Sequence, residues 1–590
     1  MLFSKQTTTL QKQKLFLAIC LLLTLGIQAQ NPVLQYGYSI GGNSEHGEFA
    51  RDMVTDPEGN VYLTGIFHDI VDFDSSAGVS ELTSTGDDDI FIAKYSATGA
   101  LVWVRLVMIF EAGTGTGEER PAAITRDEAG NLYIVGESSL GMRGTIISKW
   151  TPDGNEVWTK YLTENNPLTD IFPADVAALG NTLKITGSFR GTMDFDPSET
   201  NAVSLTGNTS AFILSLDLDG NFEWVKDIRS NSFASITAIE ADTDGNIYVT
   251  GLFNGAIDLD PSEQNVIIQS DSFSNDSVFI AKYTDQGNFV WGNTMITEGD
   301  DSLIFMSSMS IDSNDNIVVM CPFLGTVSLA INGNEVSSLS SPINTGTLIA
   351  KFTPQGNLSW AKVMAGTNQG LGFGTDVSID ACDAIYLSGE FRGNWDFDPS
   401  DSDFMMVSDS NDKSDIFLTS FSEAGNFNWA MQIGGQGNPD FVELNGHLPL
   451  VIDNDQNVVL AATFQGTLNL SPSGTPVNVT SVNMQDGTPT RDFFMAKYSN
   501  PSNCLLGINE VQNQSFRMYP NPASGLVNLT LDKEYTDYTI QIYDNIGKLV
   551  LSHNTSGSQS TIDISKLTVG IYFMEIEIEG KVFTEKLMVK

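Results

Sequence analysis

The chain has 590 residues and carries 29 basic against 73 acidic residues, a formal net charge of −44. Nucleic acid and anionic lipid surfaces are excluded as partners because they repel such a charge, which instead favours solubility and the attraction of cations. The 41% hydrophobic and 10% aromatic content argues against disorder and supplies apolar side chains for several buried cores.

The first 29 residues have the three parts of a secretory signal peptide. Lys5, Lys12 and Lys14 form a basic start, residues 15–27 (LFLAICLLLTLGI) are apolar, and Ala29 is a small residue suited to cleavage. The apolar run is too short to span a bilayer comfortably, and no later segment reaches transmembrane length. We expect residues 1–29 to be removed and the mature chain to be exported without a transmembrane segment.

Two sequence patterns recur along the chain at intervals of roughly 70 residues in its central part, which indicates internal repeats. The first is a turn followed by an apolar strand, as in DPEGNVYLTGIF (56–67) and DTDGNIYVTGLF (242–253), and it occurs seven times. The second is a strand that follows a turn and ends in tryptophan, with copies at Trp103, Trp158, Trp224, Trp291, Trp360 and Trp429.

Each repeat contains four short segments that alternate apolar and polar residues and are separated by Gly-Asn or Asp-Gly turns, a pattern typical of antiparallel strands. Repeated four-stranded sheets predict a β-propeller, since closure into a ring removes exposed sheet edges. The seventh repeat ends after its third strand, at residues 493–499. The segment LQYGYSIGG (34–42) matches FNWAMQIGG (427–435), with Tyr36 in the place of Trp429. We therefore predict that residues 33–499 form an all-β, seven-bladed propeller whose last blade is closed by the N-terminal strand.

These units resemble the seven-bladed β-propeller repeats, often called SBBP repeats, of exported bacterial proteins. The resemblance covers residues 33–499 and is carried by the turn-G-N-[VIL]-Y-x-x-G and D-G-N-x-x-W strands. It implies a fold but hardly a function, because propellers support unrelated activities.

An acidic insert follows the second strand of several repeats, as in FRGTMDFDPSE (189–199) and FRGNWDFDPSD (391–401). Two aspartates separated by one residue point the same way from an extended strand, so their oxygens could hold Ca²⁺ together with loop carbonyls. A solvated strand edge entering an Asp-Pro-Ser turn is the alternative. The candidate metal ligands are Asp72, Asp74, Asp194, Asp196, Asp258, Asp260, Asp396 and Asp398.

A phenylalanine precedes most first strands of the repeats. Up-and-down topology puts the long links between blades and between second and third strands on one face, where binding loops are free to vary. Aromatic side chains near the mouth of the ring there could stack on sugars, or they could wedge adjacent blades together. The candidate ligand-face residues are Phe49, Phe172, Phe233, Phe305 and Phe373, with Phe441 less securely aligned.

Three cysteines remain after the signal peptide: Cys321, Cys382 and Cys504. Their odd number and wide spacing exclude a disulfide framework or a cysteine-based zinc site. A Cys382–Cys504 bridge stays open.

Residues 500–515 form a predicted linker, and residues 516–590 a small Ig-like β-sandwich with alternating strands and Gly or Asn turns. This tail resembles the C-terminal type A sorting domain of the type IX secretion system of Bacteroidetes. The matching positions are Tyr519, Pro520, Asn521, Pro522, Gly547, Lys548, Gly570, Ile571 and Tyr572. The resemblance implies recognition by the secretion machinery, passage across the outer membrane and removal of the tail. Release, or attachment to the outer-membrane surface, would follow.

No hydrolase, zinc-protease, nucleotide-binding or dinucleotide motif occurs, and the four histidines show no ligand spacing. We expect no catalytic residues and no cofactor apart from Ca²⁺, and we favour a binding or scaffold module for an extracellular glycan or protein. Two carboxylates far apart in sequence leave no signature, so a secreted polysaccharide hydrolase or lyase stays open as an alternative. A structural envelope component is a third possibility.

Overall fold

The computed structural model describes residues 32–500 and 516–590 apart from short gaps. The gaps are residues 45, 87, 108–118, 139–143, 164–167, 199, 263–265, 271–275, 306, 332–333, 401, 410–412, 436–437, 440–447, 473, 485–486, 545–547, 569 and 579–580. The predicted signal peptide lies outside the described residues. The chain divides into two compact units, residues 1–501 and 502–590. Every regular element in the described residues is a strand, so no described helix is long and apolar enough to cross a membrane.

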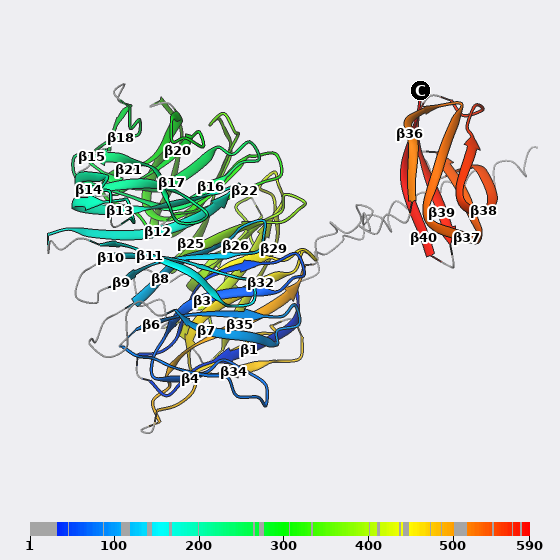
Figure 1. Cartoon of the computed structure of the whole chain (residues 1–590). Coiled ribbons are helices and arrows are strands. Elements are labelled where there is room, and N and C mark those ends of the chain that lie inside the picture. Colours follow the sequence, from blue (N-terminus) through cyan, green and yellow to red (C-terminus); the bar gives the residue numbers. More distant parts are fainter. Residues whose placement is uncertain are drawn as a thin grey trace, which may run out of the picture. The chain divides into compact units, whose positions relative to one another are not determined.

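The first unit consists of antiparallel sheets that follow one another in chain order (Figure 1). Blade 1 contains β2 (Phe49–Thr55), β3 (Val61–Phe67), β6 (Asp89–Tyr95) and β7 (Leu101–Val107). Blade 2 contains β8 (Glu119–Arg126), β9 (Leu132–Ser138), β10 (Gly144–Trp150) and β11 (Glu156–Thr163). Blade 3 contains β12 (Asp170–Leu179), β13 (Thr182–Asp194), β14 (Ser204–Asp217) and β15 (Phe222–Ser230). Blade 4 contains β16 (Phe233–Ala241), β17 (Ile247–Asn254), β20 (Ser277–Tyr283) and β21 (Phe289–Ile304).

The remaining three blades share or borrow strands. Blade 5 contains β22 (Ser308–Ile311), β23 (Ile317–Ile331), β24 (Asn334–Phe352) and the first part of β25 (Leu358–Ile379). Blade 6 contains the second part of β25, β26 (Ile385–Asp396), β28 (Asp415–Phe421) and β29 (Phe427–Gly435). Blade 7 contains β31 (Leu450–Ile452), β32 (Val458–Gln465), β35 (Arg491–Ser499) and β1 (Val33–Ile40), and β30 (Asn438–Pro439) also pairs with β32.

The N-terminal strand is the outer strand of the last blade, as predicted. β1 pairs antiparallel with β35, with Leu34 opposite Tyr498, Gly37 opposite Ala496 and Ile40 opposite Phe493. Figure 1 shows these two strands side by side although they come from opposite ends of the unit.

Seven hydrophobic clusters hold the ring together, and each one fills the space between two successive blades. The cluster that closes the ring joins Val459 and Met495 of blade 7 to Leu63 and Phe91 of blade 1. Because strands buried on both faces supply side chains to two neighbouring clusters, no blade has a core of its own. The propeller is therefore one cooperative ring of seven blades.

The tryptophans that recur in the repeats pack against turns of the following blade. The ring of Trp103 covers Gly154, where an added Cβ would lie 2.8 Å from the indole, and Trp103 Nε1 donates to Pro152 O at 3.1 Å. Tyr36 of β1 covers Gly99 of blade 1 in the same way, at 2.9 Å from an added Cβ. Tyr36 thus occupies the tryptophan position that the repeat alignment gave it. The other contacts pair Trp158, Trp224, Trp291 and Trp360 with Gly220, Gly287, Gly356 and Gly425.

In blades 1, 4, 5, 6 and 7 the insert after the second strand reaches the outer strand of the preceding blade, whereas the insert of blade 3 pairs within its own blade, between β13 and β14. β18 (Ala256–Asp258) pairs with β15, and β33 (Thr467–Asn469) pairs with β29. Extended parts of β23 and β26 pair with β21 and β25, and Gly42, just after β1, bridges to Val71 of β4 (Ile70–Asp72). The outer arms of these hairpins are β5 (Glu81–Thr83), β19 (Ile267–Gln269), β27 (Met405–Val407) and β34 (Asn478–Thr480). The inserts of blades 1, 4, 5, 6 and 7 therefore clasp neighbouring blades.

The second unit is a small β-sandwich with its own core. It contains β36 (Phe516–Ser524), β37 (Leu526–Asp544), β38 (Leu549–Asp563), β39 (Gly570–Ile578) and β40 (Lys581–Val589). β36 pairs with both β37 and β40, so the sheet folds over a cluster that includes Leu529, Ile540, Met574 and Leu587.

Candidate functional site

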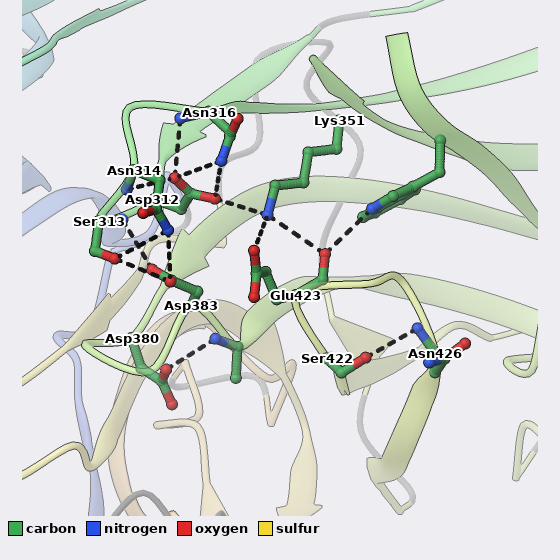
Figure 2. Close-up of polar contacts among 12 residues, drawn as sticks. Asp312, Ser313, Asn314, Asn316, Lys351, Asp380, Asp383, Ser422, Glu423 and Asn426 are labelled. Atoms are coloured by element: carbon green, nitrogen blue, oxygen red, sulfur yellow. Dashed lines mark hydrogen bonds and ion pairs between the residues drawn. The ribbon is translucent and has the colours of Figure 1, made fainter. Parts of the chain in front are cut away.

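The single group of three acidic side chains with metal-ligand proximity in the described part of the chain is formed by Asp312, Asp383 and Glu423, whose oxygens lie within 4.8 Å of one another. Figure 2 shows the side chain of Lys351 entering this group. Its Nζ lies 2.6 Å from Asp312 Oδ2 and 3.6 Å from Glu423 Oε1. Both oxygens of Asp383 accept hydrogen bonds from Ser313, from its N–H and its hydroxyl. The lysine ammonium therefore takes the place that a cation would take.

Lysine and aspartate side chains at equivalent positions form an ion pair in most blades. Nζ–Oδ2 distances are 3.4 Å for Lys94 and Asp56, 2.9 Å for Lys282 and Asp242, and 2.5 Å for Lys497 and Asp453. Burial opposes ionisation of Asp312, but hydrogen bonds from Lys351 and Asn316 outweigh it and lower its pKa. These turns are thus braced by buried ion pairs between lysine and aspartate.

The aspartates of the inserts hold their own turns. Asp194 Oδ1 accepts the N–H of Asp196 at 3.1 Å and that of Val203 at 2.7 Å, and Asp196 Oδ1 accepts the N–H of Ser198 at 2.9 Å. The pairs Asp72 and Asp74, Asp258 and Asp260, and Asp396 and Asp398 repeat this pattern. In blade 7 the neutral side chain of Asn469 makes the bonds of the first aspartate, so the turn does not require a charge. Calcium binding at these eight aspartates stays a prediction.

Five phenylalanines, which we call the aromatic rim, lie where the inner strands of five blades begin, on the face of the long loops. Phe49 and Phe233 are the first residues of β2 and β16, and Phe172 and Phe373 lie in β12 and β25. Phe305 lies between β21 and β22, three residues before β22 begins. All five remain partly exposed, and Phe172 is 40% exposed. Phe305 and Phe373 of adjacent blades meet edge to face, with ring centroids 5.1 Å apart. The sixth candidate, Phe441, lies outside the described residues.

Three aspartates that sequence reasoning missed lie below the aromatic rim. Asp52, Asp175 and Asp376 each occupy a β-bulge of an inner strand, three positions after a rim phenylalanine. Asp52 accepts the N–H of Met53 and, at 2.8 Å, that of Ile124 in blade 2. The other two make equivalent bonds, Asp175 to Ile239 N in blade 4 and Asp376 to Leu450 N in blade 7. Each carboxylate therefore staples two blades at the inner edge of the ring.

We call these three carboxyl groups and Glu240 the axial carboxylates because all four belong to inner strands, which surround the axis of the ring. Asp52, Asp175 and Asp376 come from blades 1, 3 and 6, yet each of the three repels at least one of the others, and Glu240 of blade 4 is repelled by Asp175 and Asp376. Burial is the main cause of their raised pKa values, about 7 for Asp175, about 6 for Asp376 and about 8 for Glu240. The motif F-x-x-D in blades 1, 3 and 6 is the sequence signal that reveals the first three.

Two of the four histidines, which show no ligand spacing in the sequence, come together in the fold. His46 and His68 stack with ring centroids 4.6 Å apart and nearly parallel planes, and His68 Nδ1 lies 3.1 Å from Asp88 Oδ1. Glu48 is fully buried in the same segment as His46 and accepts the N–H of Gly42 at 3.1 Å. Ring closure brings this polar cluster together, because the segment after β1 crosses there from blade 7 to blade 1.

The cysteines have separate roles. Cys321 is free and buried in the cluster between blades 4 and 5, where burial raises the pKa of its thiol. Cys382 is disulfide-bonded. Cys504 lies outside the described residues.

The predicted sorting residues are spread over the second unit. Tyr519 is 51% exposed on β36, whereas Tyr572 is buried on β39 and donates its hydroxyl to Thr568 O at 2.9 Å. Gly570 begins β39, and Lys548 is exposed next to β38. Pro520, Asn521 and Pro522 belong to β36, Ile571 belongs to β39, and Gly547 lies outside the described residues.

Comparison with known proteins finds a match for the tail and distant likenesses for the propeller. A curated relative, an uncharacterised WD repeat-containing protein of Acanthamoeba polyphaga mimivirus, is 24% identical over an alignment of 347 residues. The match covers 51% of this chain and 25% of that protein. The chain thus spans about a quarter of the length of that relative.

Solved structures with a similar chain path include a protein of unknown function from Dyadobacter fermentans, with 8% identity and a TM-score of 0.35. That likeness covers 80% of this chain and 99% of the other. The WD40 domain of SCAP from fission yeast has 7% identity, a TM-score of 0.30 and coverage of 77% and 97%. Residues 517–590 match the secretion system C-terminal sorting domain. The chain therefore ends in a sorting domain of the type IX secretion system and is a secreted β-propeller protein.

Proposed function

We propose that the protein is a binding module that the type IX secretion system delivers to the cell surface or the medium, and that the long-loop face of the propeller holds its ligand. The ligand is an extracellular glycan or protein. The observation that carries this proposal is the aromatic rim: five phenylalanines at the start of inner strands stay partly exposed in a protein whose other repeated aromatic residues pack between blades.

The sites on the opposite, short-turn face support the same assignment. There the aspartates of the first turns bond to lysine, asparagine and tyrosine side chains of their own blade, as Asp242 does with Lys282, Asn246 and Tyr248. Tight turns with satisfied polar groups offer little chain that can adapt to a ligand. The long-loop face is therefore the better location.

A secreted polysaccharide hydrolase or lyase is the second candidate, and the axial carboxylates are the observation that favours it. Raised pKa values of about 7 and 8 for Asp175 and Glu240 suit a general acid at neutral pH. Against it, both oxygens of Asp175 accept backbone N–H groups and brace two blades. Release of reducing sugar from polysaccharides that the Asp175→Asn variant no longer cleaves would establish the enzyme.

Delivery is tested by truncation. A chain that ends near residue 510 lacks the matched sorting domain, so we expect a folded propeller that stays inside the cell envelope. Immunodetection on intact cells and in the medium measures this. The full chain with His553→Gln, an exposed residue of β38 outside the matched sorting positions, is a control for nonspecific loss of expression. Surface display of the truncated chain would contradict the sorting assignment.

Binding is tested on glycan and protein arrays with the full chain, with and without Ca²⁺. We expect specific ligands whose signal falls when Phe172 is changed to alanine and is kept when Phe404, an exposed phenylalanine of the blade 6 insert, is changed instead. A protein that binds nothing on either array would contradict the proposed function.

A further inference from the structure

We propose that the aromatic rim and the axial carboxylates together form a binding site for a protein segment that inserts a lysine or arginine side chain into the centre of the ring. This inference rests on the proposed function and names the chemistry of its ligand. The cation would stack against phenylalanine rings at the entrance and meet carboxylates further in.

The phenylalanines of the aromatic rim and the axial carboxylates lie at two successive levels along the inner strands. In β2, β12 and β25 the phenylalanine comes first, and the aspartate follows three residues later across a bulge. An extended strand advances about 3.3 Å per residue. The carboxylates thus lie roughly one lysine or arginine side chain below the aromatic rim, so a long cationic side chain spans both layers.

The aromatic rim and the axial carboxylates both favour a cationic ligand. A cation is attracted to the face of an aromatic ring, and the attraction grows when water is excluded. The four axial carboxylates come from blades 1, 3, 4 and 6 and repel one another. The net charge of −44 on the whole chain adds to this negative field. An anionic or purely apolar ligand would gain nothing from these carboxylates, whereas a guanidinium or ammonium group would relieve their repulsion.

Other charged side chains also lie on the inner strands, and their contacts bear on the charge at the centre of the ring. Arg120 pairs with Asp88 at 3.0 Å, Asp170 pairs with Arg190, and Glu119 is influenced by Asp89. Arg126 lies against the turn at Gly130, and Arg51 is buried directly before Asp52 in the sequence. Arg120 and Arg126 thus contact groups other than the axial carboxylates.

The geometry also predicts a pH dependence of binding. A bound cation favours the ionised form of nearby carboxyl groups, whose pKa values near 6, 7 and 8 are raised mainly by burial. Protons are therefore released on binding, and affinity rises as the pH increases from about 6 to about 8. A site made of phenylalanine rings alone would show no such rise.

The experiment measures binding of the full chain to immobilised heptapeptides that differ only in a central arginine, lysine, norleucine or glutamate. We expect arginine and lysine peptides to bind about tenfold or more tightly than the norleucine peptide, because norleucine keeps the apolar stem and removes the charge. Phe172→Ala should weaken binding of the arginine peptide several-fold, and Phe404→Ala should leave it unchanged. Asp175→Asn keeps an oxygen acceptor for Ile239 N and should flatten the pH dependence.

Equal binding of arginine and norleucine peptides, or an affinity that ignores Phe172→Ala, would overturn the inference. If an array glycan binds in a Phe172-dependent manner while the cationic peptides do not, the inference fails and the proposed function stands. If neither glycans, proteins nor peptides bind, both fail. Thermal unfolding of each variant shows that the ring is intact when binding is measured.

Discussion

The tryptophan of one blade and the glycine of the next blade's turn explain why two residue types recur together in this chain. Gly154 has φ +76° and lies under Trp103, so a side chain there meets both backbone strain and the indole. We predict that Gly154→Ala lowers the free energy of unfolding by about 2 kcal/mol or more. Gly245→Ala is the matched control, because Gly245 has φ +85° with nothing within 4 Å of an added Cβ. Equal losses in urea unfolding would show that the indole contact contributes nothing.

Lys351 is the residue whose removal should cost most on the short-turn face. Its ammonium neutralises Asp312, whose side chain is fully buried. We predict that Lys351→Met lowers the free energy of unfolding by about 3–5 kcal/mol, because a buried carboxylate loses its partner. Adding Asp312→Asn to the same chain should recover much of this loss. If the double variant is no more stable than Lys351→Met, the ion pair is not what the lysine supplies.

At the scale of elements, the first strand of the described chain is the one that closes the ring. β1 completes blade 7, Tyr36 covers Gly99 of blade 1, and Val33 N donates to Ser499 Oγ at 3.2 Å. We predict that deletion of residues 31–42 lowers Tm severely, because blade 7 loses its outer strand and the cluster between blades 7 and 1 opens. Deletion of the β4–β5 hairpin tip, residues 75–79, is a control that leaves the ring closed. An unchanged Tm after deletion of residues 31–42 would contradict closure by β1.

At the scale of the whole molecule, raised carboxyl pKa values predict that the fold is most stable in mild acid. Burial raises the pKa of Asp376, Asp415 and Asp492 to about 6 and that of Glu119 to about 8, from 3.8 or 4.5. The folded chain thus binds more protons than the unfolded chain between about pH 4 and pH 8, and stability falls as the pH rises through this window. We expect a higher Tm near pH 5 than near pH 8. A flat profile, or a higher Tm near pH 8, would contradict the buried state of these groups.

Repetition decided what the sequence could predict of this molecule. The turn and tryptophan patterns predicted seven blades, and the match of Tyr36 to Trp429 predicted the closing strand, because every copy obeys the same packing. The axial carboxylates escaped because the aspartate is not repeated in every blade: directly after the bulge, Ala123 and Ala238 take the place of Asp52 in blades 2 and 4. The stack of His46 on His68 escaped because it depends on where the closing segment crosses between blades. The clasping role of the inserts escaped because pairing with another blade cannot be read from alternation within one strand.

Closure of the ring is tested most directly by a covalent bond across it. An added Cβ at Gly37 lies 3.6 Å from Ala496 Cβ, a separation suited to a disulfide, with only the flexible end of Leu470 in the way. We predict that Gly37→Cys with Ala496→Cys forms a disulfide under oxidising conditions, seen as a crosslinked peptide by mass spectrometry and as a raised Tm that reductant reverses. Two free thiols at these positions in the folded protein, with no crosslinked peptide, would contradict the closed seven-bladed ring.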